Sequence, residues 1–188
     1  NKKKTMSKNE KILNILLKSS IESINPRNLI RNTIKIESKN NENYLRVPKE
    51  LNYIKQNEIK NNSEYDYFRL NKNVYMIAFG KASLNMSVEF ESLLTSEHLV
   101  DGCTIIPQAE YEKNRVKFNR FDNQNQIELL DNKSSKIKFY FGAEKNLPDQ
   151  NSFNATKKVI ELIENIPKKN RNDENPLLIC LISGGGSA

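Results

Sequence analysis

Apolar runs and helical patterns alternate along the chain from residue 74 onward. Four mostly apolar runs have the length of a strand: Val74–Phe79, Gly102–Pro107, Ile137–Phe141 and Leu177–Ile182. Apolar positions at helical spacing lie between the first and second runs, and again between the third and fourth. Runs that are apolar on both faces are typical of strands buried inside a parallel sheet. The alternation therefore predicts an α/β fold with a doubly wound, mostly parallel sheet.

Weaker patterns precede residue 74. The polar residues 1–8 are predicted to form a disordered tail. Apolar residues at helical spacing from Ile12 to Ile21 predict a helix, and Pro26 is expected at the first position of a second, short helix. Residues 9–188 are expected to form one α/β domain that is incomplete at its C-terminal end. Within it we expect a loop at 37–43, a short strand at 44–47, an inserted, mobile stretch at 49–70 and a second insertion within 108–135.

The chain is basic, but its charge is scattered. It carries 23 Lys, 7 Arg and 23 acidic residues, which gives a formal net charge of +7. Asn is as overused as Lys, with 28 residues, and this points to a compositional bias of the source. No run of Lys or Arg interleaves with aromatic residues, as a surface that stacks nucleotide bases would require. We therefore expect no nucleic-acid partner.

Cysteine use and hydropathy indicate the environment. Cys103 and Cys180 lie in apolar runs and neither has a CxxC partner, so both are expected to be reduced core thiols of an intracellular protein. No apolar run approaches the roughly 20 residues of a membrane span, so we expect no membrane partner. The expected location is the cytoplasm, with the mitochondrion as an alternative. The sequence does not indicate an oligomeric state.

Two glycine-containing turns follow predicted strands. Gly80 lets the chain turn out of the first strand, and Lys81 then stands at the start of a helix, where N–H groups also attract anions. The alternative for Lys81 is an ordinary surface lysine. The second turn follows the last apolar run, and its missing Cβ atoms let successive N–H groups converge on phosphate or carboxylate oxygens. Ligands bind outside the carboxyl ends of strands in open α/β sheets, where both turns are expected. The second turn is Ser183-Gly184-Gly185-Gly186-Ser187.

A third turn follows the run that ends at Phe141. It places Glu144, Asn146 and Asp149 at the same expected edge of the sheet, although Asp149 also suits the cap of the next helix. The single histidine, His98, is expected near the end of the first crossover helix and is interpreted as a helix-end residue. No pattern identifies the ligands of a metal ion.

Four motifs occur in an order that resembles a known family. Together they resemble the N-terminal region of the ATP-dependent glycerate kinases that carry a MOFRL domain further along the chain. The resemblance covers most of residues 9–188 and implies a Rossmann-like N-terminal domain, with the site in a cleft between it and a C-terminal domain. The four motifs are Asn25-Pro26-Arg27, the strand-Gly-Lys-Ala pattern of residues 74–82, Asn146-Leu147-Pro148-Asp149, and residues 178–188 with their Ser-Gly-Gly-Gly-Ser-Ala ending.

This resemblance implies a kinase that transfers the γ-phosphoryl group of ATP to D-glycerate with Mg²⁺ or another divalent cation. Lys81 matches the family lysine that contacts a phosphate or the substrate carboxylate. Gly80 and the residues Ser183, Gly184, Gly185, Gly186 and Ser187 match the turns that line the cleft. Whether the product is 2- or 3-phosphoglycerate stays open.

Two departures from the family limit what is carried over. Many bacterial members have a histidine near the position of Lys145 or Asn146. This chain has no histidine there, so a role for this turn is less well supported. Complete members run to more than twice this length, so we expect the 188-residue chain alone to be inactive. One alternative is an oxidoreductase like a hydroxypyruvate reductase, which the missing GxGxxG motif disfavours. Another is a non-catalytic α/β binding module, which the retained Gly80-Lys81-Ala82 and glycine-rich turns disfavour.

Overall fold

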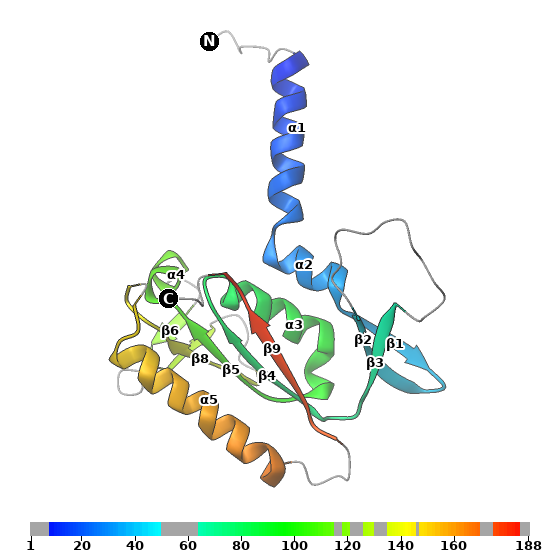
Figure 1. Ribbon diagram of the computed structural model, residues 1–188, viewed down its shortest axis with the longest axis vertical. Helices are drawn as coiled ribbons and strands as arrows, with labels where there is room; N and C mark the ends of the chain where they lie inside the picture. The colour runs from blue at the N-terminus through cyan, green and yellow to red at the C-terminus, as the bar shows by residue number, and fades with distance from the viewer. Residues whose placement is uncertain are drawn as a thin grey trace.

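The computed structural model describes residues 8–49, 64–114, 118–120, 126–129, 135–145, 147–169 and 175–184. Figure 1 shows their arrangement, with α1 projecting away from the body of the molecule. The elements are α1 (Lys8–Ser23), α2 (Pro26–Thr33), β1 (Lys35–Lys39), β2 (Glu42–Pro48), β3 (Tyr65–Leu70), β4 (Val74–Phe79), α3 (Ser83–His98), β5 (Leu99–Ile106), α4 (Gln108–Lys113), β6 (Phe118–Arg120), β7 (Gln126–Leu129), β8 (Ile137–Phe141), α5 (Gln150–Lys169) and β9 (Leu177–Ile182).

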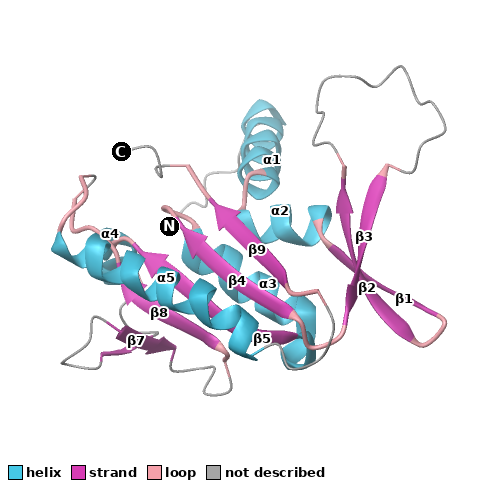
Figure 2. Ribbon diagram, turned by 60° about the horizontal axis from the view of Figure 1, so that its bottom comes forward, coloured by secondary structure: helices cyan, strands magenta, loops and turns pink. Residues whose placement is uncertain are grey.

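The main sheet has the strand order β6-β7-β8-β5-β4-β9. The four strands expected from the apolar runs are parallel, since β4 pairs with both β5 and β9, and β5 pairs with β8. The short strands β6 and β7 extend the sheet in antiparallel fashion beyond β8. Helices α3 and α5 lie on opposite sides of the strands (Figures 1 and 2). The predicted doubly wound, mostly parallel α/β sheet is therefore confirmed.

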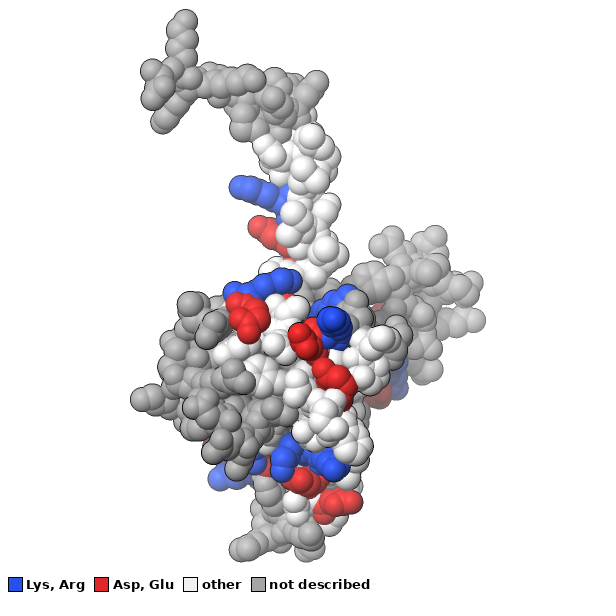
Figure 3. Space-filling model, turned by 90° about the vertical axis from the view of Figure 1, so that its left-hand side faces the viewer, with Lys and Arg blue, Asp and Glu red and all other residues white. Residues whose placement is uncertain are grey.

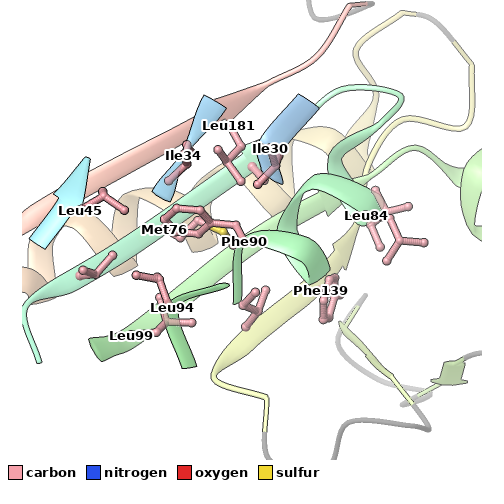
Figure 4. Packing of buried hydrophobic residues seen from close by; sticks show 14 of the residues in the cluster. Ile30, Ile34, Leu45, Met76, Leu84, Phe90, Leu94, Leu99, Phe139 and Leu181 are labelled. Atoms are coloured by element: carbon pink, nitrogen blue, oxygen red, sulfur yellow. The ribbon is translucent and has the colours of Figure 1, made fainter. Parts of the chain in front are cut away.

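Each face of the sheet has its own apolar cluster. On the α3 face, Met76 and Leu99 of the sheet pack with Phe90 of the helix, and all three are fully buried (Figure 4). Burying a side chain of this size stabilises the fold by about 1.5–3 kcal/mol. On the α5 face, Tyr75 and Cys103 pack with Leu162. Because both faces of β4 are covered, its sequence is apolar at every position, whereas β5 also buries Asp101 and Thr104.

Helix α2 begins as the sequence predicts. The side-chain oxygen of Asn25 accepts a hydrogen bond from the Arg27 N–H at 3.0 Å, and Pro26 occupies the first turn. Asn is among the preferred N-cap residues, and proline fits the first helical position because its missing N–H has no partner there. Ile30 and Ile34 then bury against the α3 side of the sheet, which attaches α2 to the domain (Figure 4).

Two expectations for the following segment were wrong. Residues 37–43 are not a loop, because β1 and β2 form a hairpin around Asn40 and Asn41, whose φ angles are 52° and 63°. Asn tolerates this left-handed backbone better than most residues, so a two-residue turn closes the hairpin. The stretch 49–70 is not wholly an insertion, because β3 (Tyr65–Leu70) pairs with β2 and buries Leu70. Residues 50–63 lie outside the described residues.

The predicted tail and the predicted second insertion fall partly outside the described residues. The tail covers residues 1–7, which are not described, and Lys8, which begins α1. Within 108–135 the chain forms α4, β6 and β7, so the described part of that segment is structured. The expectation of two core thiols is right for Cys103, which is buried, and wrong for Cys180, which is exposed.

Basic and acidic side chains lie next to each other on the surface. Figure 3 shows blue and red residues side by side on one face of the body, where the positive charge is not gathered into one patch. Ion pairs between Arg46 and Glu37 and between Lys158 and Glu161 illustrate this mixing. Among the described helices, none has the length and apolar character needed to cross a membrane.

Candidate functional site at the carboxyl edge of the sheet

The turns after β4 and β9 are in direct contact at the carboxyl edge of the sheet. The Ser183 N–H donates to the Phe79 carbonyl at 3.1 Å, which continues the pairing of the two strands. Ser183 Oγ accepts a hydrogen bond from the Ala82 N–H at 2.9 Å. The two glycine-containing turns predicted from the sequence thus meet in space, and a hydroxyl of one holds the backbone of the other.

Gly80 has to be a glycine at this contact. Its φ angle is +102°, a conformation that L-residues rarely adopt. A Cβ atom built on Gly80 would lie 2.4 Å from Ser183 Oγ and 2.6 Å from the Ser183 carbonyl oxygen. By contrast, a Cβ on Gly184 would meet nothing within 4 Å. Gly80 therefore permits the close approach of the two turns, whereas Gly184 borders open space.

Three buried hydroxyl groups fix the start of α3 behind this turn. The Ser83 N–H donates to the Gly80 carbonyl at 3.1 Å, and Ser83 Oγ donates to the Ile105 carbonyl at 2.8 Å. One turn later, Ser87 Oγ donates to the Ser83 carbonyl at 2.6 Å and contacts Thr104 Oγ1 at 2.8 Å. These bonds attach α3 to β5, so Lys81 projects from a turn whose two ends are both held.

A cavity of about 400 Å³ opens beside Lys81. It lies outside the carboxyl ends of β4, β5 and β8 and beside the first turns of α5, which is where open α/β sheets bind their ligands. Apolar residues make up much of its wall. The cavity is lined by Gly80, Lys81, Ile105, Pro107, Gly142, Ala143, Lys145, Leu147, Pro148, Asp149, Ser152, Phe153 and Thr156.

Lys81 and Lys145 both line the cavity from different turns, and both are exposed. Neither lysine forms an ion pair with another of the residues that the structure describes. Two ammonium groups without a carboxylate partner attract anions, and a cavity wall of low polarity strengthens that attraction. The chemistry of the cavity therefore suits an anionic ligand.

Asp149 holds the turn that carries Lys145. One carboxylate oxygen accepts from the Glu144 N–H at 2.9 Å, and the other accepts from the Ser152 N–H at 2.9 Å. Ser152 Oγ in turn accepts from the Asp149 N–H at 2.8 Å. The hydrogen bonds from the backbone of Glu144 and then Ser152 lower the pKa of the Asp149 carboxyl. The cap role considered for Asp149 is thus confirmed. Asp149 also lines the cavity.

The remaining candidates from the sequence either do not line the cavity or lie outside the described residues. Glu144 is exposed, and Asn146 and the turn residues Gly185, Gly186 and Ser187 lie outside the described residues. His98 ends α3 as expected, and its Nε2 lies 3.0 Å from Asn43 Nδ2, far from the carboxyl edge. Sequence reasoning did not select Lys145, Phe153 or Thr156. The sequence does contain a pattern for two of them, because Phe153 and Thr156 lie three residues apart, on one side of the first turns of the helix after Asp149.

A family model described as a domain of unknown function, DUF4147, matches residues 12–188. The chain belongs to the DUF4147 family. Among curated relatives, it is 36% identical over 121 residues to human glycerate kinase, a match that covers 64% of this chain and 20% of the human protein. It is 31% identical to the zebrafish (Danio rerio) glycerate kinase over 64% of this chain and 21% of that protein.

A longer match is to an uncharacterized protein of Caenorhabditis elegans, to which this DUF4147 domain is 30% identical over 166 residues. That match covers 88% of this chain and 28% of the worm protein. No solved structure gives a significant match. The resemblance inferred from the four motifs is therefore confirmed by the relatives. The chain spans about a fifth of the length of the glycerate kinases that it matches.

Proposed function

We propose that this chain is the N-terminal part of a kinase that transfers the γ-phosphoryl group of ATP to a hydroxyl group of D-glycerate. The products are ADP and phosphoglycerate, and the hydroxyl proton is released. The observation that carries the proposal is the bonded pair of turns at the carboxyl edge, where the Ser183 hydroxyl holds the backbone beside Lys81. The relatives named glycerate kinase support the substrate class.

Phosphoryl transfer depends on positioning and on neutralising the charge of the phosphates. Lys81 suits this task because its turn is held at Gly80, Ala82 and Ser83 while its side chain stays exposed at the cavity. Lys145 supplies a second cation from another turn that lines the same cavity. We assign Lys81 to a phosphate of ATP or to the glycerate carboxylate, and Lys145 to the other anionic group.

The described residues fit ATP better than they fit a metal ion. Apolar wall residues such as Leu147 and Phe153 suit a nucleoside, and the two lysines suit its phosphates. Among the described residues, no group of three or more His, Cys, Asp and Glu could hold a metal ion. Mg²⁺ is usually bound by one or two carboxylates together with the phosphates of the substrate, so the ion would reach this site with ATP rather than through a cage of protein ligands.

The decisive experiment measures ATP-dependent phosphorylation of D-glycerate by the intact protein and its Lys81→Ala variant. Removing a cation that stabilises developing charge is expected to lower kcat/KM by about 100-fold or more. Lys35→Ala is the matched control, because Lys35 is an exposed lysine on β1, outside the cavity, and its removal should leave kcat/KM unchanged.

Two outcomes would contradict the proposal. Unchanged turnover of Lys81→Ala would remove this lysine from the site. Absence of glycerate phosphorylation by the unaltered intact protein, together with NADH oxidation in the presence of hydroxypyruvate, would assign it to the oxidoreductases. The 188-residue chain is expected to show no glycerate phosphorylation, because the proposed cleft needs a second domain to close it.

A further inference from the structure

Phe153 is an exposed aromatic side chain in the wall of the cavity beside Lys81. It lies near the start of α5 and is 55% exposed. The Lys157 ammonium lies over its ring, with Nζ 4.4 Å from the ring centroid. Lys157 is outside the described wall of the cavity, so the ring meets the cavity with its remaining surface. One face of the ring thus packs against a cation, and the other can contact a ligand.

The Thr156 hydroxyl lies beside this ring and is restricted to one role toward a ligand. Thr156 lines the cavity three residues after Phe153, on the same side of the helix. Its Oγ1 donates its single hydrogen to the Ser152 carbonyl at 2.8 Å. A hydroxyl has one hydrogen and two lone pairs, so after this bond Oγ1 can only accept. The pair therefore offers a ring face and a hydrogen-bond acceptor within one helical turn.

The size of the cavity distinguishes between the two substrates of the proposed reaction. Its volume of about 400 Å³ lies in the range of about 300–1,000 Å³ that is typical of pockets for larger organic ligands. D-glycerate is a three-carbon acid and would leave most of this space empty. A nucleotide has both an aromatic base for the apolar wall and phosphates for the lysines. The cavity therefore suits the nucleotide rather than D-glycerate.

The start of α5 leaves the phosphates to the lysines. A helix N-terminus attracts anions through its free N–H groups. Here the Asp149 carboxylate already accepts from the Ser152 N–H at 2.9 Å, which places a negative charge at this end of α5. Phosphates are therefore expected at Lys81 and Lys145, and the α5 part of the cavity is left for an uncharged group.

We propose that Phe153 and Thr156 form the base-binding part of the ATP site and that Thr156 selects adenine. The adenine ring stacks on the Phe153 face that is turned away from Lys157, and its 6-amino group donates to Thr156 Oγ1. The triphosphate extends from there toward Lys81. A base with a 6-oxo group would instead place an acceptor against an acceptor, which leaves both without a partner. This inference rests on the proposed ATP-dependent reaction and adds the residues that recognise the base.

Calorimetric titration of the intact protein with ATP, in the absence of D-glycerate, tests the stacking contact. Phe153→Ala is expected to raise the Kd for ATP by about tenfold, because it removes the surface on which the base stacks. Phe153→Tyr keeps the ring and should leave Kd nearly unchanged. Ile160→Ala is the matched control, since Ile160 is a 49% exposed apolar residue of the same helix outside the cavity wall. An unchanged Kd for Phe153→Ala would overturn the proposal.

A second titration tests the role of Thr156. Purine riboside triphosphate lacks the 6-amino group, so the unaltered protein is expected to bind ATP about fivefold more tightly than this analogue. Thr156→Val has nearly the same shape but no acceptor, and it should abolish the preference, whereas Thr156→Ser should keep it. Equal affinity of the unaltered protein for both nucleotides would overturn the proposal, as would a preference that persists in Thr156→Val.

These binding measurements do not depend on phosphoryl transfer, so the two proposals can fail separately. Glycerate phosphorylation by the intact protein, with an unchanged Kd for ATP in Phe153→Ala, would overturn the base site alone. ATP binding that depends on Phe153 and Thr156, without phosphorylation of D-glycerate, would overturn the proposed reaction alone.

Discussion

Gly80 and Ser183 approach so closely that the position of a Cβ atom on Gly80 is occupied by Ser183, whose Oγ lies 2.4 Å from it. The contact joins the turns after β4 and β9, which lie on either side of the point where the sheet reverses its winding direction. Such a switch point is the usual ligand-binding position of a doubly wound sheet. The contact therefore shapes the backbone beside Lys81 before any ligand arrives.

Gly80→Ala is expected to destabilise the protein by about 2–4 kcal/mol, because it combines a strained φ angle with a clash against the Ser183 backbone. Gly184→Ala is the matched control and should change stability by less than about 0.5 kcal/mol. Urea unfolding of both variants measures the difference. Equal stabilities would show that the turns separate without cost.

Ser183→Ala removes the acceptor of the Ala82 N–H and is expected to cost about 1 kcal/mol in unfolding free energy. It should not rescue Gly80→Ala, since the Ser183 carbonyl oxygen would still lie 2.6 Å from the new Cβ. The double variant in urea unfolding checks this. Full recovery of stability in the double variant would show that the hydroxyl alone causes the clash.

Lys145→Ala is expected to raise KM for one anionic substrate of the intact enzyme by about tenfold while changing kcat less, because a positioning charge contributes mainly to binding. Steady-state kinetics with ATP and D-glycerate varied separately would identify which substrate Lys145 contacts. The exposed Lys113 of α4, which pairs with Glu110, is the control. Unchanged KM for both substrates would remove Lys145 from the site.

Asp149 is expected to make the free energy of unfolding depend on pH in the acid range. Its folded-state pKa is lowered, so its contribution to stability is complete above the unfolded pKa and declines as the pH falls through the folded value. The stability advantage over Asp149→Asn should therefore be constant above about pH 5 and shrink below about pH 4. Urea midpoints from pH 3 to 7 measure it, with Glu112→Gln as an exposed control. A pH-independent difference would contradict this assignment.

Arg31 on α2 pairs with Glu89 on α3, whose side chain is only 4% exposed. Arg31→Ala should cost about 2 kcal/mol, because it leaves a buried carboxylate without its cation. Adding Glu89→Gln should recover part of that loss. Lys158→Ala, which breaks a surface pair, should cost less than about 1 kcal/mol. Thermal unfolding would compare the variants, and an equal loss in both single variants would contradict the burial argument.

The four parallel strands and the two crossover helices from Val74 onward could be predicted because local patterns decide them, whereas α4, β6 and β7 lie in a segment predicted to be an insertion. The strands β4, β8 and β9 have the predicted bounds, and Pro26 begins α2. The predictions that failed for residues 37–43 and 49–70 concerned segments whose pairing is non-local or whose turn is made by Asn. A polar strand such as β3 is stabilised by its hydrogen bonds to β2, and its sequence alone does not contain that partner.

The candidate site could be predicted in part for the same reason. Gly80, Lys81 and Ser183 follow apolar runs directly, so their place at the carboxyl edge follows from the alternation of strands and helices. Lys145 could not be selected, because lining the cavity depends on how the β8–α5 turn folds back onto β5. Asp149 makes that turn through two backbone hydrogen bonds.

The sequence by itself determined the four parallel strands, the crossover helices and the two glycine turns, because side-chain periodicity and the φ range of glycine act over a few residues. Only the tertiary structure decided that Ser183 holds the turn of Lys81, and that β9 has one covered and one open face. Both depend on the strand order, in which β9 returns to lie beside β4. Strand order is set by contacts between distant segments, and local periodicity does not encode it.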